Sequence, residues 1–456
     1  MLNVFRLYKR AALFAALSAT ISCSSETQIG STLPESLSTG QTAWTTTKAA
    51  PTSELTAPTG TLAQYLAFAL SNSPETRAAF ETWRSVRLRR SSASRLPEPV
   101  ISFGYYLRSV ETKVGPQLYK IGVSQAFPWP GKLASAENAV AERSKAAALM
   151  VDAKVLEVKR KVAMAYWDLW LIGEQHKLKT EHDAILEALA GAVRGRLQVG
   201  TATLADLNQI DLNIARHHDH LGQHKEAAIK ASAILRSVIG SARADENLPA
   251  TDLPPAGVPK ASASQLIAMS RKHPMIEKFS HLASSEEHRA SARKADRYPR
   301  FKVGINLIGT GEASNAVEDS GKDALVISAG LSLPLWGSSY GDAAESAIAA
   351  SLSHEAMLEA GIRQSEAMME SALSDVRDSQ RKIELYEKTL IPQAESTFEA
   401  VLGGYQIGRS TVAAVIIAQR DLIELRLDRA LARARRAKSW ATLEFVVGQA
   451  LDTGAQ

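Results

Sequence analysis

The stretch "SQAFPWPGKLASAENAV", residues 124–140, places two prolines and a glycine within four positions, Pro128 to Gly131. The residues before it alternate as in a short strand, and those after it favour a helix with no proline for dozens of residues. A proline ends a strand ladder because it has no N–H, and it also fits the first turn of a helix. The stretch therefore predicts an abrupt change from a strand into a very long helix.

The same arrangement occurs a second time in "LPLWGSSY", residues 333–340, which pairs Pro128 with Pro334 and Gly131 with Gly337. Other segments correspond in the same order, at spacings of about 200 residues. This period is too long for a solenoid repeat and indicates two copies of one unit. We divide the chain into a signal peptide (1–22), a Ser/Thr/Pro-rich tether (23–60), a first repeat (61–246), a linker (247–260), a second repeat (261–450) and a tail (451–456).

Each repeat is expected to contain a helix, two short strands, a very long helix and, after a glycine turn, a further helix. The helices are predicted at 61–95, 131–198 and 203–239, and again at 263–296, 338–406 and 411–446. At 1.5 Å per residue, a helix of ~70 residues is ~100 Å long. Such a rod needs neighbouring helices along its length, so we expect a coiled-coil-like helical wall.

The four predicted strands, 101–107, 119–125, 301–307 and 325–333, alternate apolar residues with small or polar ones. One face of their sheet is therefore apolar and the other is wet. Their length suits tilted transmembrane strands, but a four-stranded sheet has two open edges that hydrocarbon does not tolerate. Several copies must then share one barrel, and three copies would supply twelve strands. The predicted fold is mostly α, with a helical barrel and a transmembrane β-barrel completed by trimerisation.

The N-terminus has the layout of an export signal, with basic residues, then the apolar run "AALFAALSAT", then small residues. The only cysteine, Cys23, follows directly, where a bacterial lipoprotein carries its acylated first residue. The net charge of +5 falls to +2 once Arg6, Lys9 and Arg10 are removed with the signal, and this excess is too small to indicate nucleic-acid binding. The sequence contains no motif typical of an enzyme or of a cofactor site.

The tandem repeat, the strand–"FPWPGK"–helix junction and the paired turns "RLQVG" and "YQIG" together resemble the TolC-like outer-membrane efflux family, over residues 60–450. The resemblance implies a homotrimer in the bacterial outer membrane, surrounded by its lipid, whose helical tunnel extends into the periplasm. It also implies two partners, a periplasmic adaptor protein and an inner-membrane pump. The junction is most similar to the branch that serves cation or heavy-metal exporters of the RND type.

The resemblance also assigns roles to residues. Asp206 and Tyr405 correspond to links that hold the periplasmic entrance shut, and the position equivalent to Asp206 in the second repeat is Ala414. The adaptor would contact the helix tips at Val199, Gly200, Thr201, Ile407, Gly408, Arg409 and Ser410. The junction between barrel and tunnel would be formed by Pro128, Trp129, Pro130, Gly131, Pro334, Trp336 and Gly337.

Three alternatives stay open at this point. The duct could carry drugs or secreted polypeptides instead of metal cations. The chain could instead be a periplasmic coiled-coil scaffold tethered by Cys23, with its strands in a soluble cap. Finally, His217, His220 and His224 share one helical face and are candidates for binding a metal, although a hydrated helix face explains the same pattern and we expect no metal site.

Overall fold

The computed structural model describes residues 60–241 and 248–454. The expected signal peptide, nearly all of the expected tether and the lipidation candidate Cys23 lie outside these described residues. The described part confirms a mostly helical chain with one main antiparallel sheet.

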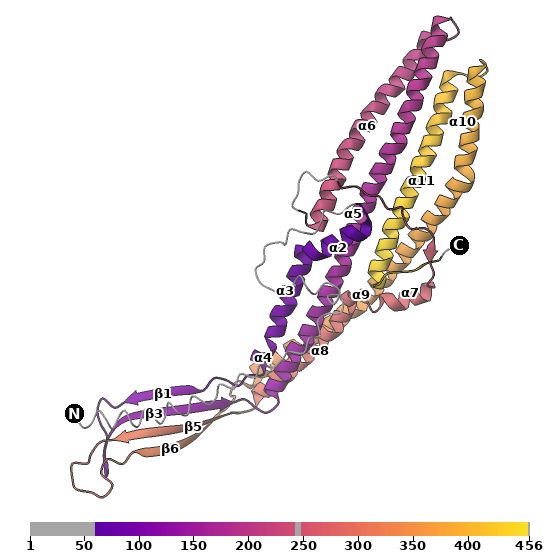
Figure 1. Cartoon of the computed structure of the whole chain (residues 1–456). Helices are drawn as coiled ribbons and strands as arrows, with labels where there is room; N and C mark the ends of the chain where they lie inside the picture. Colours follow the sequence, from indigo (N-terminus) through magenta and orange to yellow (C-terminus); the bar gives the residue numbers. More distant parts are fainter. Residues whose placement is uncertain (1–59, 242–247, 455–456) are drawn as a thin grey trace. The chain divides into compact units, whose positions relative to one another are not determined.

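The two repeats contain the same series of elements (Figure 1). In the first repeat these are α2 (Leu62–Asn72), α3 (Pro74–Leu88), α4 (Arg90–Ala93), β1 (Val100–Tyr105), β2 (Glu111–Thr112), β3 (Gly115–Phe127), α5 (Lys132–Gln198) and α6 (Leu204–Ile239). In the second they are α7 (Ala263–Ser270), α8 (Pro274–Lys294), a 3₁₀ turn (Ala295–Arg297), β5 (Arg300–Thr310), β6 (Ala324–Ser332), α9 (Gly337–Leu385), a π-helical turn (Tyr386–Leu390), α10 (Ile391–Gln406) and α11 (Val412–Val447).

The first helix of each repeat is broken, although the sequence suggested one helix over 61–95 and one over 263–296. Ser73 and His273 adopt extended backbone conformations and cap the helices that begin at Pro74 and Pro274. The Ser73 hydroxyl accepts a hydrogen bond from the Thr76 amide at 3.3 Å. A proline fits the first position of a helix but not its interior, so each helix has to restart there.

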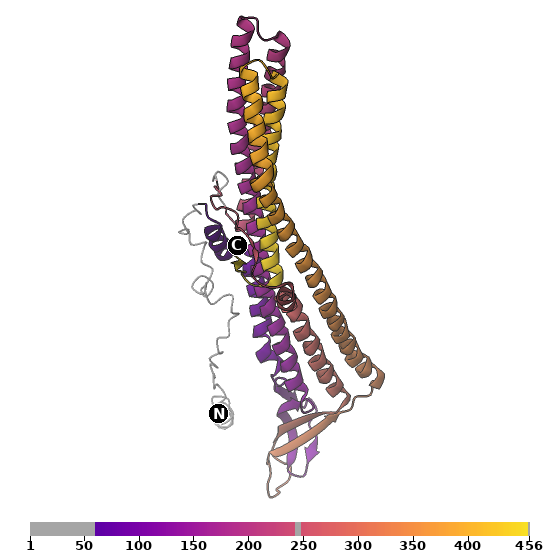
Figure 2. The ribbon, with the colours of Figure 1, turned by 90° about the vertical axis from the view of Figure 1, so that its right-hand side faces the viewer.

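The long helix α5 is flanked by shorter helices along its length. Helices α3 and α8 pack on its first part, and α6 packs on its second part (Figures 1 and 2). A buried aromatic cluster around Tyr166, Trp167 and Trp170 lies near the middle of α5. This arrangement confirms the expected helical wall. The π-helical turn directly before Pro392 interrupts the corresponding rod of the second repeat, where proline supplies no N–H to the preceding turn.

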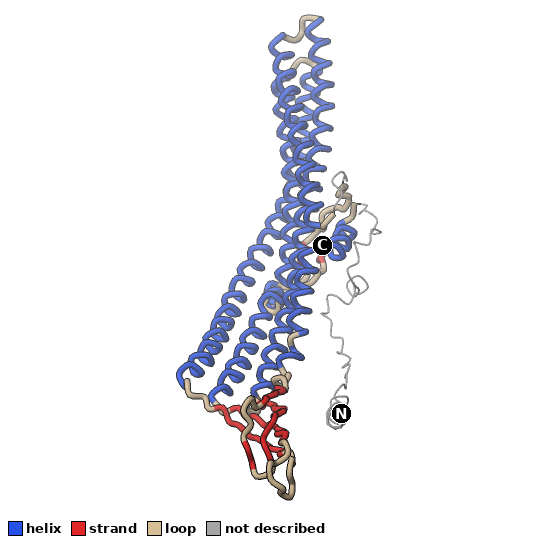
Figure 3. The backbone as a smooth tube through the Cα atoms, turned by 90° about the vertical axis from the view of Figure 1, so that its left-hand side faces the viewer, coloured by secondary structure: helices blue, strands red, loops and turns tan. Residues whose placement is uncertain are grey.

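The main sheet has the order β1-β3-β5-β6, and it lies at one end of the helices (Figure 3). All three pairings along this path are antiparallel, with Ile101 opposite Val123, Phe127 opposite Phe301 and Ile305 opposite Ile327. The sheet has the expected two faces. Large apolar side chains such as Ile101 and Ile327 are each 76% exposed on one of them. On the other, Asn306 donates a hydrogen bond to Ser328 at 3.1 Å, and a Cβ added at Gly122 would lie 2.3 Å from Asn306 Oδ1.

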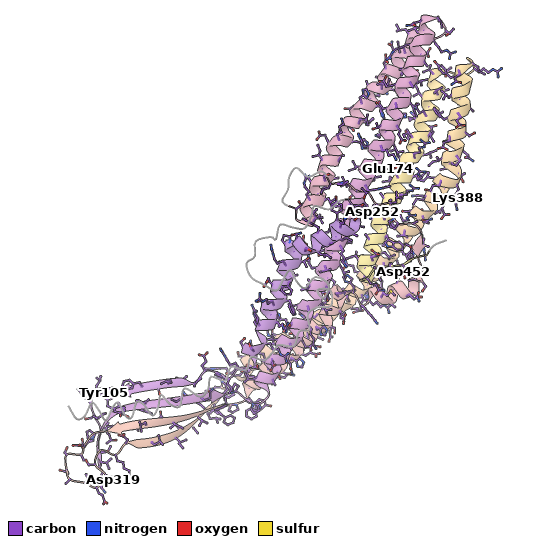
Figure 4. All side chains as sticks on the ribbon, in the orientation of Figure 1. Tyr105, Glu174, Asp252, Asp319, Lys388 and Asp452 are labelled. Atoms are coloured by element: carbon purple, nitrogen blue, oxygen red, sulfur yellow. The ribbon has the colours of Figure 1, made fainter. Side chains whose placement is uncertain are left out.

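The linker packs against the helices instead of only joining the repeats. Leu248 is 2% exposed, and the buried Tyr166 hydroxyl donates to Gly60 O and accepts from the Asp252 amide, at 2.8 Å each. Asp252 lies beside α2 and α5 (Figure 4), and its carboxylate accepts a hydrogen bond from the Leu62 amide. The linker strand β4 (Val258–Pro259) also pairs with β7 (Thr453–Gly454) of the tail. The sequence did not predict this pairing.

None of the described helices combines the length and the apolar character that crossing a bilayer would require.

Candidate functional site: the paired helix tips

The two helix tips farthest from the sheet have the same backbone structure. Helix α5 ends at Gln198 and helix α10 at Gln406, and two residues later Gly200 and Gly408 have left-handed φ values of 75° and 78°. The Thr201 amide donates to Arg196 O at 2.9 Å, and the Arg409 amide donates to Gly404 O at 2.7 Å. These are the bonds of a Schellman motif, which satisfies helix-end carbonyls and needs a residue without a side chain at the left-handed position. The repeated "VG" and "IG" therefore specify two matching tips.

The helices that follow these turns begin with different caps. Thr203 and Asp206 form a reciprocal capping box at the start of α6, in which the Asp206 carboxylate accepts from the Thr203 amide at 2.9 Å and from its hydroxyl at 2.7 Å. These two donors hold the pKa of Asp206 below its ordinary value. At the start of α11, Thr411 accepts from the Ala414 amide at 3.2 Å, and Ala414 has no side chain with which to reciprocate.

A shared apolar core joins the two hairpins just behind the tips. Its members come from α5, α6, α10 and α11 and include Leu186, Val193, Ile210, Tyr405 and Val412.

Within this core, Arg196 of the first hairpin holds Tyr405 of the second. Its guanidinium donates to Tyr405 O at 2.7 Å and lies 4.6 Å from the centre of the Tyr405 ring. The Tyr405 side chain is only 6% exposed, and its hydroxyl has no hydrogen-bond partner among the described residues.

The two residues predicted to form the gate are not bonded to each other in this structure. Among the described residues, no hydrogen bond joins the Asp206 carboxylate to Tyr405, because Asp206 caps its own helix. Sequence reasoning missed Arg196, which makes the contact between hairpins. Arg196 and Tyr405 are 209 residues apart in the sequence. The sequence indicated only that Arg196 lies near the tip, in the last turn of the helix that ends at Gln198.

The outer surface of the tips is partly apolar. Val199 and Ile407 occupy the same position in the two turns and are 72% and 66% exposed, and Leu204 is 62% exposed. Thr201 and Arg409 are also exposed, and Ser410 is half-buried. The predicted adaptor-contact residues therefore form a mixed apolar and polar surface at the end of each hairpin.

The two junctions between strand and helix differ in how their tryptophans pack. Trp129 stacks on Tyr298 with ring centres 4.6 Å apart, while Gly131 has a left-handed φ of 85° before α5 begins. Trp336, the equivalent residue of the second junction, is 73% exposed. Tyr298, which covers Trp129, belongs to the second repeat. The tryptophan of the first junction is therefore covered by the other repeat of the same chain, whereas the tryptophan of the second junction stays exposed among the described residues. Pro128, Pro130 and Pro334 lie in the same two connections, and Gly337 is the first residue of α9.

The histidine candidates lie on α6, where His217 is buried against α5, His224 is half-buried and His220 is exposed. The His217 ring is 4.9 Å from the His182 ring, and its Nε2 is 2.7 Å from Lys179 O. Asp183 Oδ1 lies 3.3 Å from His218 Nε2. Burial lowers the pKa of His182 to about 4 and lowers that of His217 and His224. The described residues contain no group of three histidine, cysteine, aspartate or glutamate side chains placed to hold a metal ion.

The chain is a duplicated helical hairpin wall, with the β1-β3-β5-β6 sheet at one end and the paired turns at the other, and this fold is similar to that of solved outer-membrane channels. Residues 271–449, within the second repeat, match the family model described as outer membrane efflux protein. No curated protein matches the sequence.

Solved structures of such channels are similar over most of the chain. CusC is 16% identical with a TM-score of 0.71, covering 89% of this chain and 98% of its own. VceC of Vibrio cholerae is 18% identical with a TM-score of 0.70, covering 85% and 96%. MtrE of Neisseria gonorrhoeae, solved in its open state, is 18% identical with a TM-score of 0.68, covering 85% and 89%. At these identities the likeness shows the fold, and it confirms the predicted fold class.

Proposed function

We propose that this chain is one protomer of a homotrimeric outer-membrane channel, the passive exit duct of a tripartite efflux system. A periplasmic adaptor and an inner-membrane RND-type pump deliver the cargo, which we infer to be metal cations from the resemblance of the "FPWPGK" junction. The channel conducts and does not catalyse.

The observation that carries this proposal is the two-faced sheet, whose outer strands β1 and β6 each have one edge that pairs with no other strand of the described residues. Ile101, Phe103 and Tyr105 of the edge strand β1 are 76%, 71% and 64% exposed, and Leu325 and Ile327 of the other edge strand β6 are 69% and 76% exposed. So large an apolar surface on two edge strands would aggregate in water. Pairing the edges with neighbouring copies removes the unsatisfied backbone groups and turns the apolar face towards lipid.

The tips would then form the periplasmic entrance. We infer that Asp206 and Tyr405 act at this gate, and that Arg196 keeps Tyr405 in place. The exposed Val199 and Ile407, with Gly200, Thr201, Gly408, Arg409 and Ser410, would contact the adaptor. A ring of three Asp206 carboxylates, one from each protomer, would favour the passage of cations. The equivalent position of the second repeat is Ala414, so the second repeat adds no carboxylate to this ring.

Membrane fractionation and the mass of the detergent-extracted protein test the proposal. We expect an outer-membrane protein that extracts as a stable trimer. A monomer that is soluble without detergent would instead support a periplasmic scaffold and would refute the channel.

Planar-bilayer recordings test the gate. Conductance should be low in the wild type and should rise with Asp206→Ala combined with Tyr405→Phe. An unchanged conductance would remove both residues from the gate. Metal sensitivity of a strain lacking the chain, restored by the wild type, would support cation cargo, whereas sensitivity to drugs alone would assign the duct to organic molecules.

A further inference from the structure

The positive charge of the chain is concentrated in two short segments. Residues 84–99 and 289–304 together carry eleven basic and two acidic residues, a net charge of +9. The whole chain has a net charge of +5, so everything outside these two segments sums to −4. Both segments lead from the short helices of a repeat into its first strand, so the feature occurs once in each repeat.

The structure places both segments at the end of the helices that adjoins the sheet (Figure 1). The first segment covers the end of α3, α4 and the connection to β1, and the second covers the end of α8, the 3₁₀ turn and the start of β5. Two basic residues of α5, Lys132 and Arg143, lie beside them. We call this set the basic collar: Arg84, Arg87, Arg89, Arg90, Arg95, Lys132, Arg143, Arg289, Arg293, Lys294, Arg297 and Arg300.

A groove of about 400 Å³ lies within the collar, between α4, α5 and α8. Its apolar lining comes from four alanines and a valine, and four basic side chains and two acidic ones surround it. Arg289 pairs with Glu286 at 3.2 Å, and Lys132 pairs with Asp296. Arg143 is exposed and makes no ion pair with any described residue. The groove therefore keeps an excess of positive charge above an apolar surface.

Helix α11 is the other basic part of the chain, and most of its basic side chains pair with carboxylates. There Arg426 pairs with Glu395 at 2.7 Å, Arg435 with Asp375 at 2.8 Å and Lys438 with Asp168 at 2.6 Å. In the collar, Arg143, Arg297 and Arg300 have no carboxylate partner within the described chain. With a net charge of +9 in its two segments, the collar keeps positive charge that no described carboxylate neutralises and that a partner outside the protomer can bind.

Aromatic residues lie at the same level as the collar. Trp129 stacks on Tyr298, which lies between the collar residues Arg297 and Arg300, and Trp336 is exposed at the second junction. Tryptophan and tyrosine favour the headgroup region of a bilayer, and basic side chains beside them favour anionic headgroups.

We propose that the basic collar binds the phosphate groups of anionic phospholipids in the periplasmic leaflet, and that the groove holds one headgroup with its acyl chains against the apolar sheet. This inference rests on the proposed outer-membrane location of the sheet. The collar would fix how far the sheet enters the bilayer.

Native mass spectrometry and vesicle binding of the full-length, detergent-extracted protein test the proposal. The probes are vesicles of phosphatidylcholine alone and of phosphatidylcholine mixed with phosphatidylglycerol. The collar variant combines Arg143→Gln, Arg293→Gln and Arg297→Gln. The matched control combines Arg363→Gln, Arg381→Gln and Arg420→Gln, which removes the same charge from exposed arginines of the helical wall.

We expect the wild type to prefer the anionic vesicles and to lose that preference at high salt. The collar variant should lose about fivefold in affinity for each charge removed, while the control keeps the wild-type value. Equal lipid preference in the two variants would overturn the proposal. So would a change in the ion selectivity of the channel without a change in lipid preference, because the collar would then face the lumen. Inorganic phosphate at the same concentration should not compete, and effective competition by it would indicate a soluble anion site instead.

The two proposals fail in different ways. If the collar variant remains trimeric and conducting but wild type shows no anionic preference, only the collar proposal is wrong. If the wild type itself is monomeric and does not conduct, the proposed function is wrong.

Discussion

Replacing Arg196 by alanine should weaken the link between the two hairpins by an amount that the structure allows to be calculated. The change removes a hydrogen bond from a charged donor to Tyr405 O at 2.7 Å, and a guanidinium 4.6 Å from the Tyr405 ring. Hydrogen bonds to charged groups contribute about 1.5–3 kcal/mol and exposed cation–π contacts about 0.5–1 kcal/mol. Because Arg196 is only partly buried, we take the low end of both ranges, about 2 kcal/mol in total.

That free energy corresponds to a change of about thirtyfold in the equilibrium between joined and separated hairpins. In single-channel recordings, the open fraction of Arg196→Ala should therefore rise by about that factor, and hydrogen exchange of residues 405–412 should accelerate.

The control is Arg194→Ala, two positions earlier on the same helix. Among the described residues, Arg194 forms an ion pair with Asp211 of its own hairpin and with no other, at 3.3 Å and with both side chains about half-exposed. Its loss should therefore change the equilibrium by less than about 1 kcal/mol. Identical behaviour of the two variants would refute the assignment of Arg196 as the link.

Three further predictions concern stability. Acidification from pH 7.5 to 5 should loosen the α5–α6 hairpin, because burial lowers the pKa of His182 to about 4 and also lowers that of His217. The unfolded state then binds more protons over this range, so stability that is present above pH ~6.5 is lost as the pH falls towards 4. Hydrogen exchange of residues 176–224 should accelerate on acidification, and His182→Leu should reduce this pH dependence. Tyr166→Phe should lower the free energy of unfolding by about 1–2 kcal/mol in urea titrations, because it removes the hydroxyl that bridges Gly60 O and the Asp252 amide. The control Tyr65→Phe removes the hydrogen bond to Pro249 O and should lower it by less. Equal losses in the two variants would contradict the bridging role of Tyr166. Gly200→Ala should lower the free energy of unfolding by about 1 kcal/mol in the same assay, because the left-handed φ of Gly200 is unfavourable for alanine. No other atom lies within 4 Å of the added Cβ, so no steric clash adds to this effect. An unchanged free energy would mean that the backbone of the turn moves out of the left-handed region.

The sequence was most informative where one local pattern decides the structure. The prolines and glycine after Phe127 fixed the start of α5, which runs from Lys132 to Gln198, and the alternation in the strands identified the apolar face of the sheet. The breaks at Ser73 and His273 were also readable, since each precedes a proline, but a continuous helical pattern outweighed that signal.

Other features depend on contacts between distant segments, which no local pattern contains. The linker was expected to be a plain connector, yet Leu248 is buried and Asp252 is held by Tyr166. His182 was not among the candidates for binding a metal, and the structure places its ring against that of His217 on another helix. Arg196 was missed for the same reason. Whether Asp206 and Tyr405 act together stays a prediction about the assembled channel.

The Tyr405 hydroxyl, buried without a partner, has a consequence for how easily the hairpins separate. A buried polar group without a hydrogen bond costs about 1–3 kcal/mol relative to the same group in water. Movement that lets water reach this hydroxyl recovers that cost, so the packed arrangement is under tension that Arg196 opposes. These two contributions are similar in size and nearly cancel, so the shared apolar core behind the tips supplies most of the free energy that keeps the hairpins together.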